Sequence, residues 1–237
     1  MNESKNFNLD FSLSKEALER VKILLKDEEG SYFRISVLGG GCSGFQYEFS
    51  FDKKPKDDDM IFKEGGIDYL INNAGAAWGA NYDDFPESGW DKVIDLNLKT
   101  PFFLTQKLTP LLEKKGTSED PSRVVNIASI DGLHVPLMET YSYTASKSGI
   151  IHLTKHLAKT LVSRNIIVNA IAPGPFDSHM LGKAVNFDYS FIAESVPRKR
   201  IGSPEDIAGL CIYLCSRAGA YTIGETITCD GGLAKLL

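Results

Sequence analysis

Three short apolar segments, each ending in small or polar turn residues, limit what this 237-residue chain can fold into. They are residues 67–71, 124–128 and 166–171, and segments long enough to form helices separate them. Apolar runs of this length are typical of strands buried in a parallel sheet, and the segments between them then supply the crossover helices. A fourth strand is predicted at 226–229. The sequence therefore predicts an α/β fold with a parallel sheet.

A tyrosine and a lysine lie four residues apart, Tyr143 and Lys147, at the start of a helix predicted over 143–162. This spacing places both side chains on one helix face. We expect the Lys147 ammonium to favour the phenolate and to lower the pKa of Tyr143 toward the range of an acid/base catalyst. Tyr141 has Ala145 at the same spacing and lacks such a partner. Alone, the pair also fits an ordinary helix with a snorkelling lysine.

Other motifs accompany this pair in a definite order along the chain. They are Asn72-Asn73-Ala74-Gly75 after the first strand, Asn97 within a helix predicted over 86–112, Ser129 after the second strand, and Pro173-Gly174 after the third. With these motifs, the chain from about Ile67 to Leu233 resembles the short-chain dehydrogenase/reductase family. The segment from Arg198 onward is most similar to its 3-oxoacyl reductases.

The resemblance implies a catalytic site at the carboxyl edge of the sheet, where open α/β sheets bind their ligands. Its catalytic residues would be Asn97, Ser129, Tyr143 and Lys147. In this family the tyrosine is the acid/base and the lysine tunes it, while the serine polarises the substrate carbonyl and the asparagine holds a water in the proton relay. The implied substrate is a small carbonyl or alcohol of the 3-oxoacyl kind, and we expect a homo-oligomer.

The resemblance also implies a nicotinamide cofactor, NADP or NAD. The implied contacts are Asn73, Ala74 and Gly75 beside the ribose, Tyr143 and Lys147, and then Pro173, Gly174, the Phe176 backbone and the Ser178 hydroxyl around the nicotinamide. The residue that distinguishes NADP from NAD belongs to a strand that is not evident in this chain, so the choice between the two stays open.

The first 66 residues follow a different pattern. Leu18, Val21 and Leu25 form one apolar stripe, which predicts a helix over 13–29, and the alternating segments 32–38 and 45–51 predict two strands. Gly39, Gly41 and Gly44 between these strands match G-x-G-x-x-G. A phosphate loop opens into a helix, whereas here a strand follows, so we do not assign a dinucleotide-phosphate loop.

Residues 11–65 instead resemble the A-type iron-sulfur carrier (HesB-like) family through the segment Gly39-Gly40-Gly41-Cys42-Ser43-Gly44-Phe45-Gln46-Tyr47. That family adds two cysteines in a late Cys-Gly-Cys, and this chain has no Cys-x-Cys. A cluster takes about four ligands, so Cys42 is at most a lone remnant ligand. We predict no metal site and no iron-sulfur cluster.

These resemblances predict two domains, a truncated carrier-like segment at 1–66 and the C-terminal part of a reductase domain at 67–237. The fold class is then α/β, a partial doubly wound (Rossmann-like) parallel sheet lacking its first strand-helix units, with a small N-terminal α+β segment. The edge at Ile67–Ile71 needs a cover, and the alternatives are the N-terminal strands, a second chain, or a poorly folded protein that is prone to aggregate. Without the glycine-rich pyrophosphate anchor we expect weak or absent cofactor binding. The alternatives are an iron-sulfur carrier remnant or an inactive fusion product.

Composition narrows the class of partner. The chain has 26 basic and 31 acidic residues, which indicates no nucleic-acid surface and no anionic membrane partner. No apolar run approaches the roughly 20 residues that span a bilayer. Four irregularly spaced cysteines suit a reducing compartment, so we expect a cytoplasmic protein.

Overall fold

The computed structural model describes residues 32–39, 45–52, 67–136, 138–178, 181–182 and 188–236. The chain divides into two compact units, residues 1–63 and 64–237, and each is described by itself.

The first unit contains an antiparallel hairpin of β1 (Tyr32–Gly39) and β2 (Phe45–Asp52). In the register of this pair Phe33 lies opposite Phe51, and Val37 opposite Tyr47. Both predicted strands are confirmed and are one residue longer than expected. Because a strand follows the glycine run, the run does not open a helix. The predicted helix 13–29 and Cys42 lie outside the described residues.

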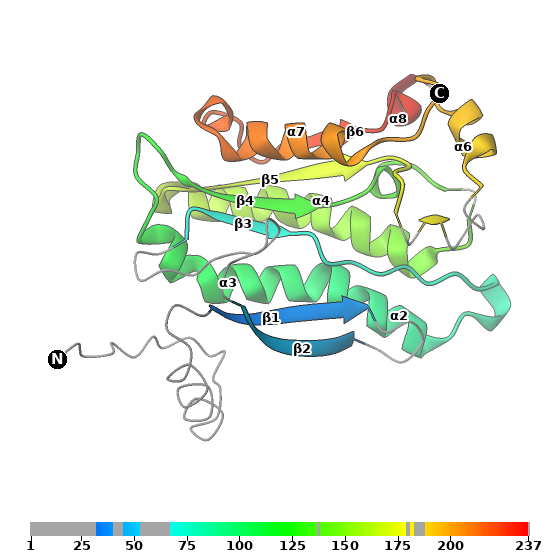
Figure 1. The fold of residues 1–237 in the computed structure, drawn as a ribbon, viewed down its shortest axis with the longest axis horizontal. Coiled ribbons are helices and arrows are strands. Elements are labelled where there is room, and N and C mark those ends of the chain that lie inside the picture. Colours follow the sequence, from blue (N-terminus) through cyan, green and yellow to red (C-terminus); the bar gives the residue numbers. More distant parts are fainter. Residues whose placement is uncertain are drawn as a thin grey trace. The chain divides into compact units, whose positions relative to one another are not determined.

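The second unit contains a four-stranded sheet in the order β3-β4-β5-β6 (Figure 1). All of its pairs are parallel. The strands are β3 (Tyr69–Asn72), β4 (Ser122–Ile127), β5 (Ile166–Pro173) and β6 (Thr226–Cys229). This is the predicted Rossmann-like α/β architecture. β3 starts two residues later than predicted, because the Ile67 amide bonds to the Leu111 carbonyl instead of a neighbouring strand.

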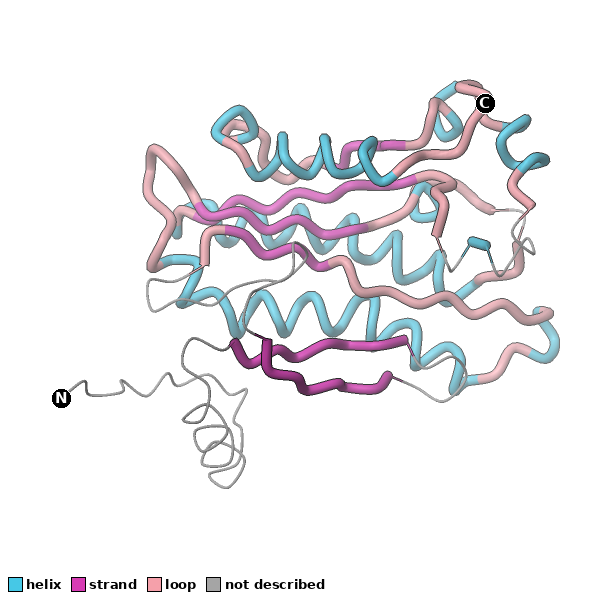
Figure 2. Tube along the Cα trace, viewed as in Figure 1, coloured by secondary structure: helices cyan, strands magenta, loops and turns pink. Residues whose placement is uncertain are grey.

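Helices connect these strands (Figure 2). The α-helices are α2 (Glu87–Ile94), α3 (Thr100–Glu113), α4 (Tyr141–Leu161), α6 (Ser190–Ser195), α7 (Pro204–Cys215) and α8 (Leu233–Leu236). Short 3₁₀ turns cover Tyr82–Asp84, Ile130–Gly132 (η4), Val162–Arg164 and Arg217–Gly219. Ser203 and Asp206 form a capping box that starts α7 where the Ser-Pro-Glu-Asp motif predicts a helix start.

Successive side chains of β5 point to opposite faces of the sheet, and each face is covered by packed residues. Ala170 and Ala172 pack with Ile150 and Ile151 of α4. Ile171 packs on the other face with Val125 of β4 and Leu214 of α7. Cys211, Cys215 and Cys229 are partly buried and pack against this second cluster.

The helix predicted over 86–112 is interrupted. A π-helical turn, Asp95–Lys99, lies between α2 and α3. The Thr100 amide donates to the Asp95 carbonyl five residues back, and the Thr100 hydroxyl donates to the same oxygen at 2.7 Å. Pro101 has no N–H and therefore cannot bond to the Asn97 carbonyl as a regular α-helical turn requires. The continuous helix predicted over 86–112 is therefore wrong at this turn.

β3 is an edge strand of the four-stranded sheet, and the β1–β2 hairpin forms a separate sheet. Tyr69 is 48% exposed and Ile71 is 37% exposed. Within the four-stranded sheet no strand precedes β3, so the first strand-helix units of a complete doubly wound domain are not among the described residues.

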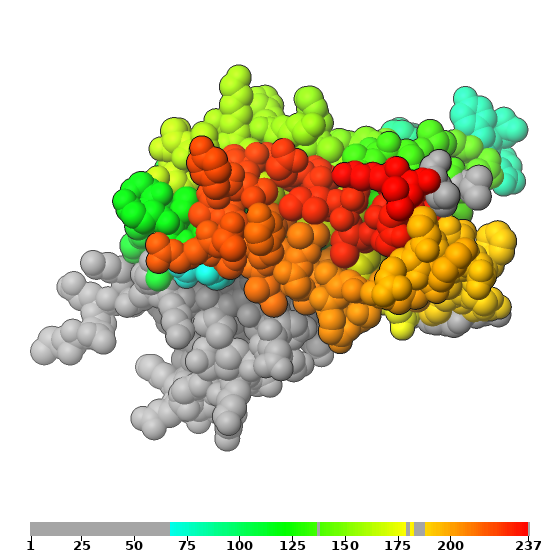
Figure 3. Space-filling model, turned by 90° about the horizontal axis from the view of Figure 1, so that it is seen from above, coloured from blue at the N-terminus to red at the C-terminus, as the bar shows by residue number. Residues whose placement is uncertain are grey.

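Several large apolar residues of the second unit are exposed. Figure 3 shows α7 and the C-terminal segment (orange to red) as one continuous surface, in which Ile212 is 67% exposed. In the part of the chain that the structure describes, no helix is both long and apolar enough to cross a membrane.

Candidate active site

Ser129 follows β4 at the carboxyl edge of the sheet and begins the turn η4. Its backbone is extended, and its Oγ accepts a hydrogen bond from the Asp131 amide at 3.1 Å. At Gly132 an added Cβ would lie 2.6 Å from the Lys147 carbonyl, so η4 packs directly on the backbone of α4. The Ser148 hydroxyl donates to the Gly132 carbonyl at 3.0 Å. These contacts hold Ser129 in a constant position relative to the first turns of α4.

Tyr143 and Lys147 lie on this part of α4, as predicted, and the Lys147 Nζ is 5.4 Å from the centroid of the Tyr143 ring. Lys147 is 4% exposed, and its Nζ donates to the Ile127 carbonyl at 2.7 Å. Burial lowers the pKa of Lys147 to about 8. An ammonium carries three protons, so further donors remain for a ligand at this edge.

The expected lowering of the pKa of Tyr143 is wrong for the protein without ligand. Burial of the phenol raises this pKa above its ordinary value, and the charge of Asp131 raises it further. A hydrogen bond with the Ser129 side chain acts in the opposite direction. The Lys147 ammonium donates to the Ile127 carbonyl and is not among the groups that shift this pKa. Tyr143 is therefore a protonated phenol at neutral pH, suited to donating a proton.

Asn97 lies in the π-helical turn and is buried. Its Oδ1 accepts from the Ala76 amide, and its Nδ2 donates to the Ala76 carbonyl, each at 2.9 Å. Nδ2 also donates to the Ser146 Oγ at 3.0 Å, and Ser146 donates to the Tyr143 carbonyl at 2.7 Å. Asn97 thus joins the loop after β3 to α4, and both of its amide protons are donated to protein groups.

A second amide network was not found from the sequence. The Asn72 Nδ2 donates to the Asn126 Oδ1 at 2.7 Å, and the Asn126 Nδ2 donates to the Thr154 Oγ1 at 2.9 Å. These bonds connect β3, β4 and α4 beneath the site. The usable signal was an asparagine at or next to the end of each of two neighbouring strands, Asn72 in β3 and Asn126 in β4.

The predicted ribose contacts, Asn73, Ala74 and Gly75, follow β3 at the same edge. Asn73 and Ala74 are exposed. A Cβ added at Gly75 would lie 3.4 Å from the Asn97 Oδ1 and 3.6 Å from the Lys147 Nζ. The structure therefore brings this turn next to Lys147, with space beside its ammonium.

The segment after β5 also ends at this edge. A Cβ at Gly174 would lie 2.7 Å from the Asp230 side chain, so only glycine permits the close approach of the two strand ends. Phe176 forms a parallel bridge with Gly202 that uses the Pro175 carbonyl and the Asp177 amide. The amide and carbonyl of Phe176 itself then point away from this bridge. Ser178 is exposed, and its Oγ accepts from the Leu181 amide at 3.2 Å.

These residues fit the nicotinamide-ribose end of a cofactor. A buried ammonium with unused protons, a glycine turn beside it and available backbone groups at Phe176 suit ribose hydroxyls and a carboxamide. The pyrophosphate end is different. Across the described ranges, no glycine-rich turn joins a strand of this sheet to the N-terminus of a helix ahead of β3. The described residues also contain no group of three metal-ligating side chains.

Comparisons with known proteins agree with this geometry. The family model described as enoyl-(acyl carrier protein) reductase matches residues 58–234. A 3-oxoacyl-[acyl-carrier-protein] reductase of rhamnolipid biosynthesis from Pseudomonas aeruginosa is 43% identical over 224 residues, which cover 92% of this chain and 87% of the relative. This chain belongs to the short-chain dehydrogenase/reductase family. The family match begins at residue 58, nine residues before the predicted start.

Solved structures of family members are similar. An NADP complex of the Pseudomonas aeruginosa protein RhlG has a TM-score of 0.67 and 41% identity, covering 70% of this chain and 66% of that one. A gluconate 5-dehydrogenase from Burkholderia cenocepacia, in complex with NADP and tartrate, also has a TM-score of 0.67, with 28% identity, 74% of this chain and 68% of that one covered. The chain thus spans about two thirds of the length of these structures.

Proposed function

We propose that this chain is an NADP-dependent oxidoreductase that interconverts a carbonyl and a secondary alcohol on a small molecule. The observation that carries the proposal is the continuous set of contacts that joins Asn97 through Ser146 to Tyr143, with Lys147 and Ser129 beside the same phenol. A bound nicotinamide would supply or take up the hydride. The protein's own residues would position the substrate and move the proton.

In the reduction direction, Tyr143 would donate its phenolic proton to the carbonyl oxygen. Because burial raises its pKa, the phenol holds that proton at neutral pH. Ser129 would donate a hydrogen bond to the same oxygen and stabilise the negative charge that develops there. Lys147 would place its remaining protons on the ribose and, while charged, stabilise the phenolate left after proton transfer.

The proton must then be replaced from solvent. The Asn97 side chain is saturated by Ala76 and Ser146, so it would act by positioning rather than by donating. Its backbone carbonyl lacks an amide four residues ahead, because that residue is Pro101. This carbonyl would be the acceptor for the relay water that the sequence analysis assigned to Asn97.

For the substrate, the names of the relatives favour two classes of compound. A 3-oxoacyl thioester is suggested by the Pseudomonas aeruginosa reductase, and a hydroxylated carbon chain by the gluconate dehydrogenase. Both present a ketone to the same catalytic groups. A homo-oligomer and a cytoplasmic location are part of this proposal. The iron-sulfur alternative for residues 11–65 stays a prediction, since Cys42 lies outside the described residues.

The test combines binding and turnover on the purified full chain. NADPH should raise the midpoint of thermal unfolding, because a ligand that binds only the folded state stabilises it. Reduced nicotinamide mononucleotide is the matched control, since it lacks the adenosine half. Equal shifts for the two would mean that only the nicotinamide end is held, as expected without a pyrophosphate anchor. Oxidation of NADPH by a 3-oxoacyl thioester or a hydroxyketone is then followed by absorbance. Absence of both a shift and turnover would contradict the proposal and favour the inactive fusion product.

A further inference from the structure

The strand β3 has a free edge, which is the side that faces away from β4. In the parallel register Tyr69 lies beside Arg123, and the Arg123 amide donates to the Asp68 carbonyl at 2.9 Å. In a parallel ladder, alternate residues of a strand bond to the same neighbour. The backbone groups of Asp68 and Leu70 therefore point to β4, whereas those of Tyr69 and Ile71 point to the free edge.

The side chains of β3 alternate as well. Leu70 is fully buried and Asn72 is 8% exposed, whereas Tyr69 and Ile71 lie on the opposite face of the sheet and are exposed. The Ile71 carbonyl also accepts from the Asn73 amide at 3.1 Å, but a carbonyl oxygen has a second lone pair. The free edge thus presents two N–H groups and two C=O groups beside an aromatic and a β-branched side chain.

This edge lacks the features that normally prevent a sheet from pairing with another chain. Such features are a lysine, a proline or a bulge on the edge strand. Tyr69 and Ile71 are instead residue types that favour strands. The charge nearest in sequence, Asp68, lies 3.9 Å from the Lys115 ammonium. Among the described residues no strand pairs with this edge, so it is a template for a strand from outside the sheet.

The sequence of β3 is complementary to a second copy of itself. In an antiparallel pair centred on Leu70, Tyr69 would lie opposite Ile71 of the second copy, and Ile71 opposite Tyr69 of that copy. Opposite residues in such a pair can exchange two hydrogen bonds, so the two pairs would use every backbone group at the free edge. Each pair would also bring an aromatic side chain against a β-branched one, which is a favourable cross-strand contact.

The neighbouring symmetric registers would use the edge less well. A pair centred on Tyr69 would place Ile71 opposite Ile67, whose amide already donates to the Leu111 carbonyl. A pair centred on Ile71 would place Tyr69 opposite Asn73, whose amide is also already bonded. A shift by one residue would set outward backbone groups against inward ones. The register centred on Leu70 is therefore the one that the backbone favours.

We propose that the free edge of β3 is an interface between two copies of this chain, which pair antiparallel about Leu70 across a two-fold axis. Charge is compatible with this register, because Asp68 would lie opposite Asn72 of the second copy and like charges would not meet. The proposed function includes a homo-oligomer without a defined contact, and this inference names one. The interface is small, so we expect weak association, with a Kd on the order of 1–100 μM.

Sedimentation velocity of the full chain at about 1 to 200 μM, a range that spans this Kd, tests the association. The wild-type chain should show a dimerisation step in this range. Ile71→Lys leaves the bonds to β4 in place and should raise the Kd about tenfold or more, since lysine on an edge opposes pairing. Tyr69→Lys is the second variant if Ile71→Lys does not fold. Ile212→Lys, at an exposed position of α7, is the control and should keep the wild-type Kd. Equal association of Ile71→Lys and wild type would overturn the proposal.

Cross-linking tests the register. A mixture of Tyr69→Cys and Ile71→Cys chains would bring the two new thiols opposite each other, at a Cα distance of about 5.5 Å that permits a disulfide. Oxidation with glutathione disulfide should link the mixture, and peptide mapping should place the link between positions 69 and 71. Each variant alone is the control and should not link, because its two thiols would be offset by two residues along the strands. Equal linking of the mixture and of either variant alone would overturn the register, and with it the proposal.

Hydrogen exchange distinguishes other occupants of the edge. The Tyr69 and Ile71 amides are measured in the dilute monomer and in the concentrated chain. Protection that appears with concentration supports pairing of two copies. Full protection in the dilute monomer would mean that residues 1–63 of the same chain cover the edge, and would overturn the proposal. Absence of both association and protection would overturn it as well. The proposed function would remain in either case, because its proton transfer uses no group at this edge.

Discussion

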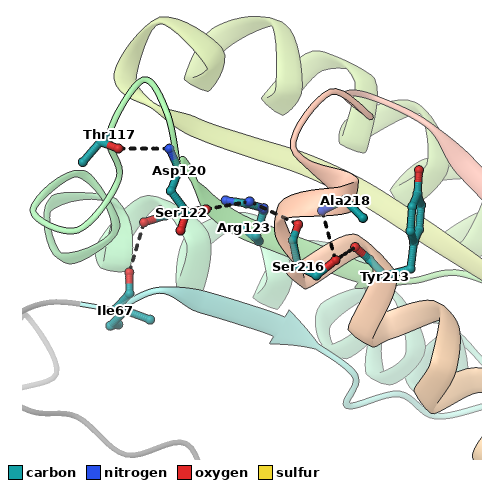
Figure 4. A network of polar contacts seen from close by, with 8 residues as sticks. All are labelled: Ile67, Thr117, Asp120, Ser122, Arg123, Tyr213, Ser216 and Ala218. Carbon is teal, nitrogen blue, oxygen red and sulfur yellow. Dashed lines mark hydrogen bonds and ion pairs between the residues drawn. The ribbon is translucent and has the colours of Figure 1, made fainter.

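Buried polar residues lie where the strands of the four-stranded sheet begin (the amino edge) and where they end (the carboxyl edge). The two groups differ in how fully the protein satisfies their hydrogen bonds. At the amino edge, the Ser122 hydroxyl lies 3.2 Å from the Ile67 carbonyl (Figure 4). It lies 2.7 Å from the Leu112 carbonyl. Arg123, 2% exposed, donates through Nη2 to Asp120 at 2.9 Å and to the Ser216 carbonyl at 3.2 Å. These bonds tie β4 to the start of the unit and to the end of α7.

At the carboxyl edge, by contrast, the polar side chains retain hydrogen-bond donors or acceptors that no described residue occupies. Lys147 has one described acceptor for three protons, and among the described residues Ser129 is the hydrogen-bond partner of the Tyr143 hydroxyl. Asp131 has no donor among the described residues. One strand, β4, thus begins with the polar pair Ser122 and Arg123 and is followed by the candidate site residue Ser129. The difference lies in which hydrogen-bonding capacity remains for a ligand.

The largest effect that this comparison predicts is on turnover. Tyr143→Phe removes the proton donor and should lower kcat by about two to four orders of magnitude, the usual contribution of general acid catalysis. The free energy of unfolding should change little. Tyr141→Phe is the matched control, because Tyr141 is exposed on the same helix and bonds to Glu139. Steady-state kinetics of both variants decide it, and substantial activity in Tyr143→Phe would contradict the assignment.

The next effect is the change in unfolding free energy with pH that the buried Lys147 ammonium causes. The pKa of Lys147 is about 8 in the folded protein and 10.5 ordinarily, so between these pH values the unfolded chain binds more protons. Stability from this group therefore rises with pH across that window, by up to about 3 kcal/mol. Lys147→Met lacks this dependence. The difference in unfolding free energy between Lys147→Met and wild type should shrink as the pH is raised from 8 to 10, and a constant difference would show that the ammonium is solvated.

A smaller effect is expected at the amino edge. Arg123→Met removes the bonds to Asp120 and the Ser216 carbonyl, and we expect the unfolding free energy to fall by about 1–2 kcal/mol. Asp120 is more than half exposed, so water replaces part of the lost interaction. Kinetic constants should not change, because no reacting group is near. Chemical denaturation measures the effect, with exposed Arg217→Met as control. A fall in kcat of the folded Arg123→Met variant would contradict the assignment of a purely structural role to the amino edge.

The sequence predicted the strands and the order of the site residues well, because apolar runs and the turns that end them are local signals. The pKa shifts at the site could not be predicted from the sequence in this way, because they depend on burial in the folded structure. The direction of the pKa shift of Tyr143 depends on desolvation and on Asp131, neither of which the spacing to Lys147 reveals. The break before α3 had a local signal in Pro101, which went unused. Asp131 had none, since a carboxylate in a turn is ordinary until its neighbours are known.

The smallest predicted change in stability is at a position away from both edges. Gly209 lies inside α7, and an added Cβ would meet nothing within 4 Å. Gly209→Ala should raise the unfolding free energy by about 0.5–1 kcal/mol, because alanine loses less backbone entropy in a helix than glycine does. Gly116, near the amino edge, gives the contrasting variant, since a Cβ there would lie 2.2 Å from the Asn165 carbonyl. Gly116→Ala must displace backbone and should destabilise the protein. Thermal unfolding of the two alanine variants in parallel checks both signs. Stabilisation by both would mean that the amino edge is looser than its hydrogen bonds indicate, and would weaken the contrast with the carboxyl edge.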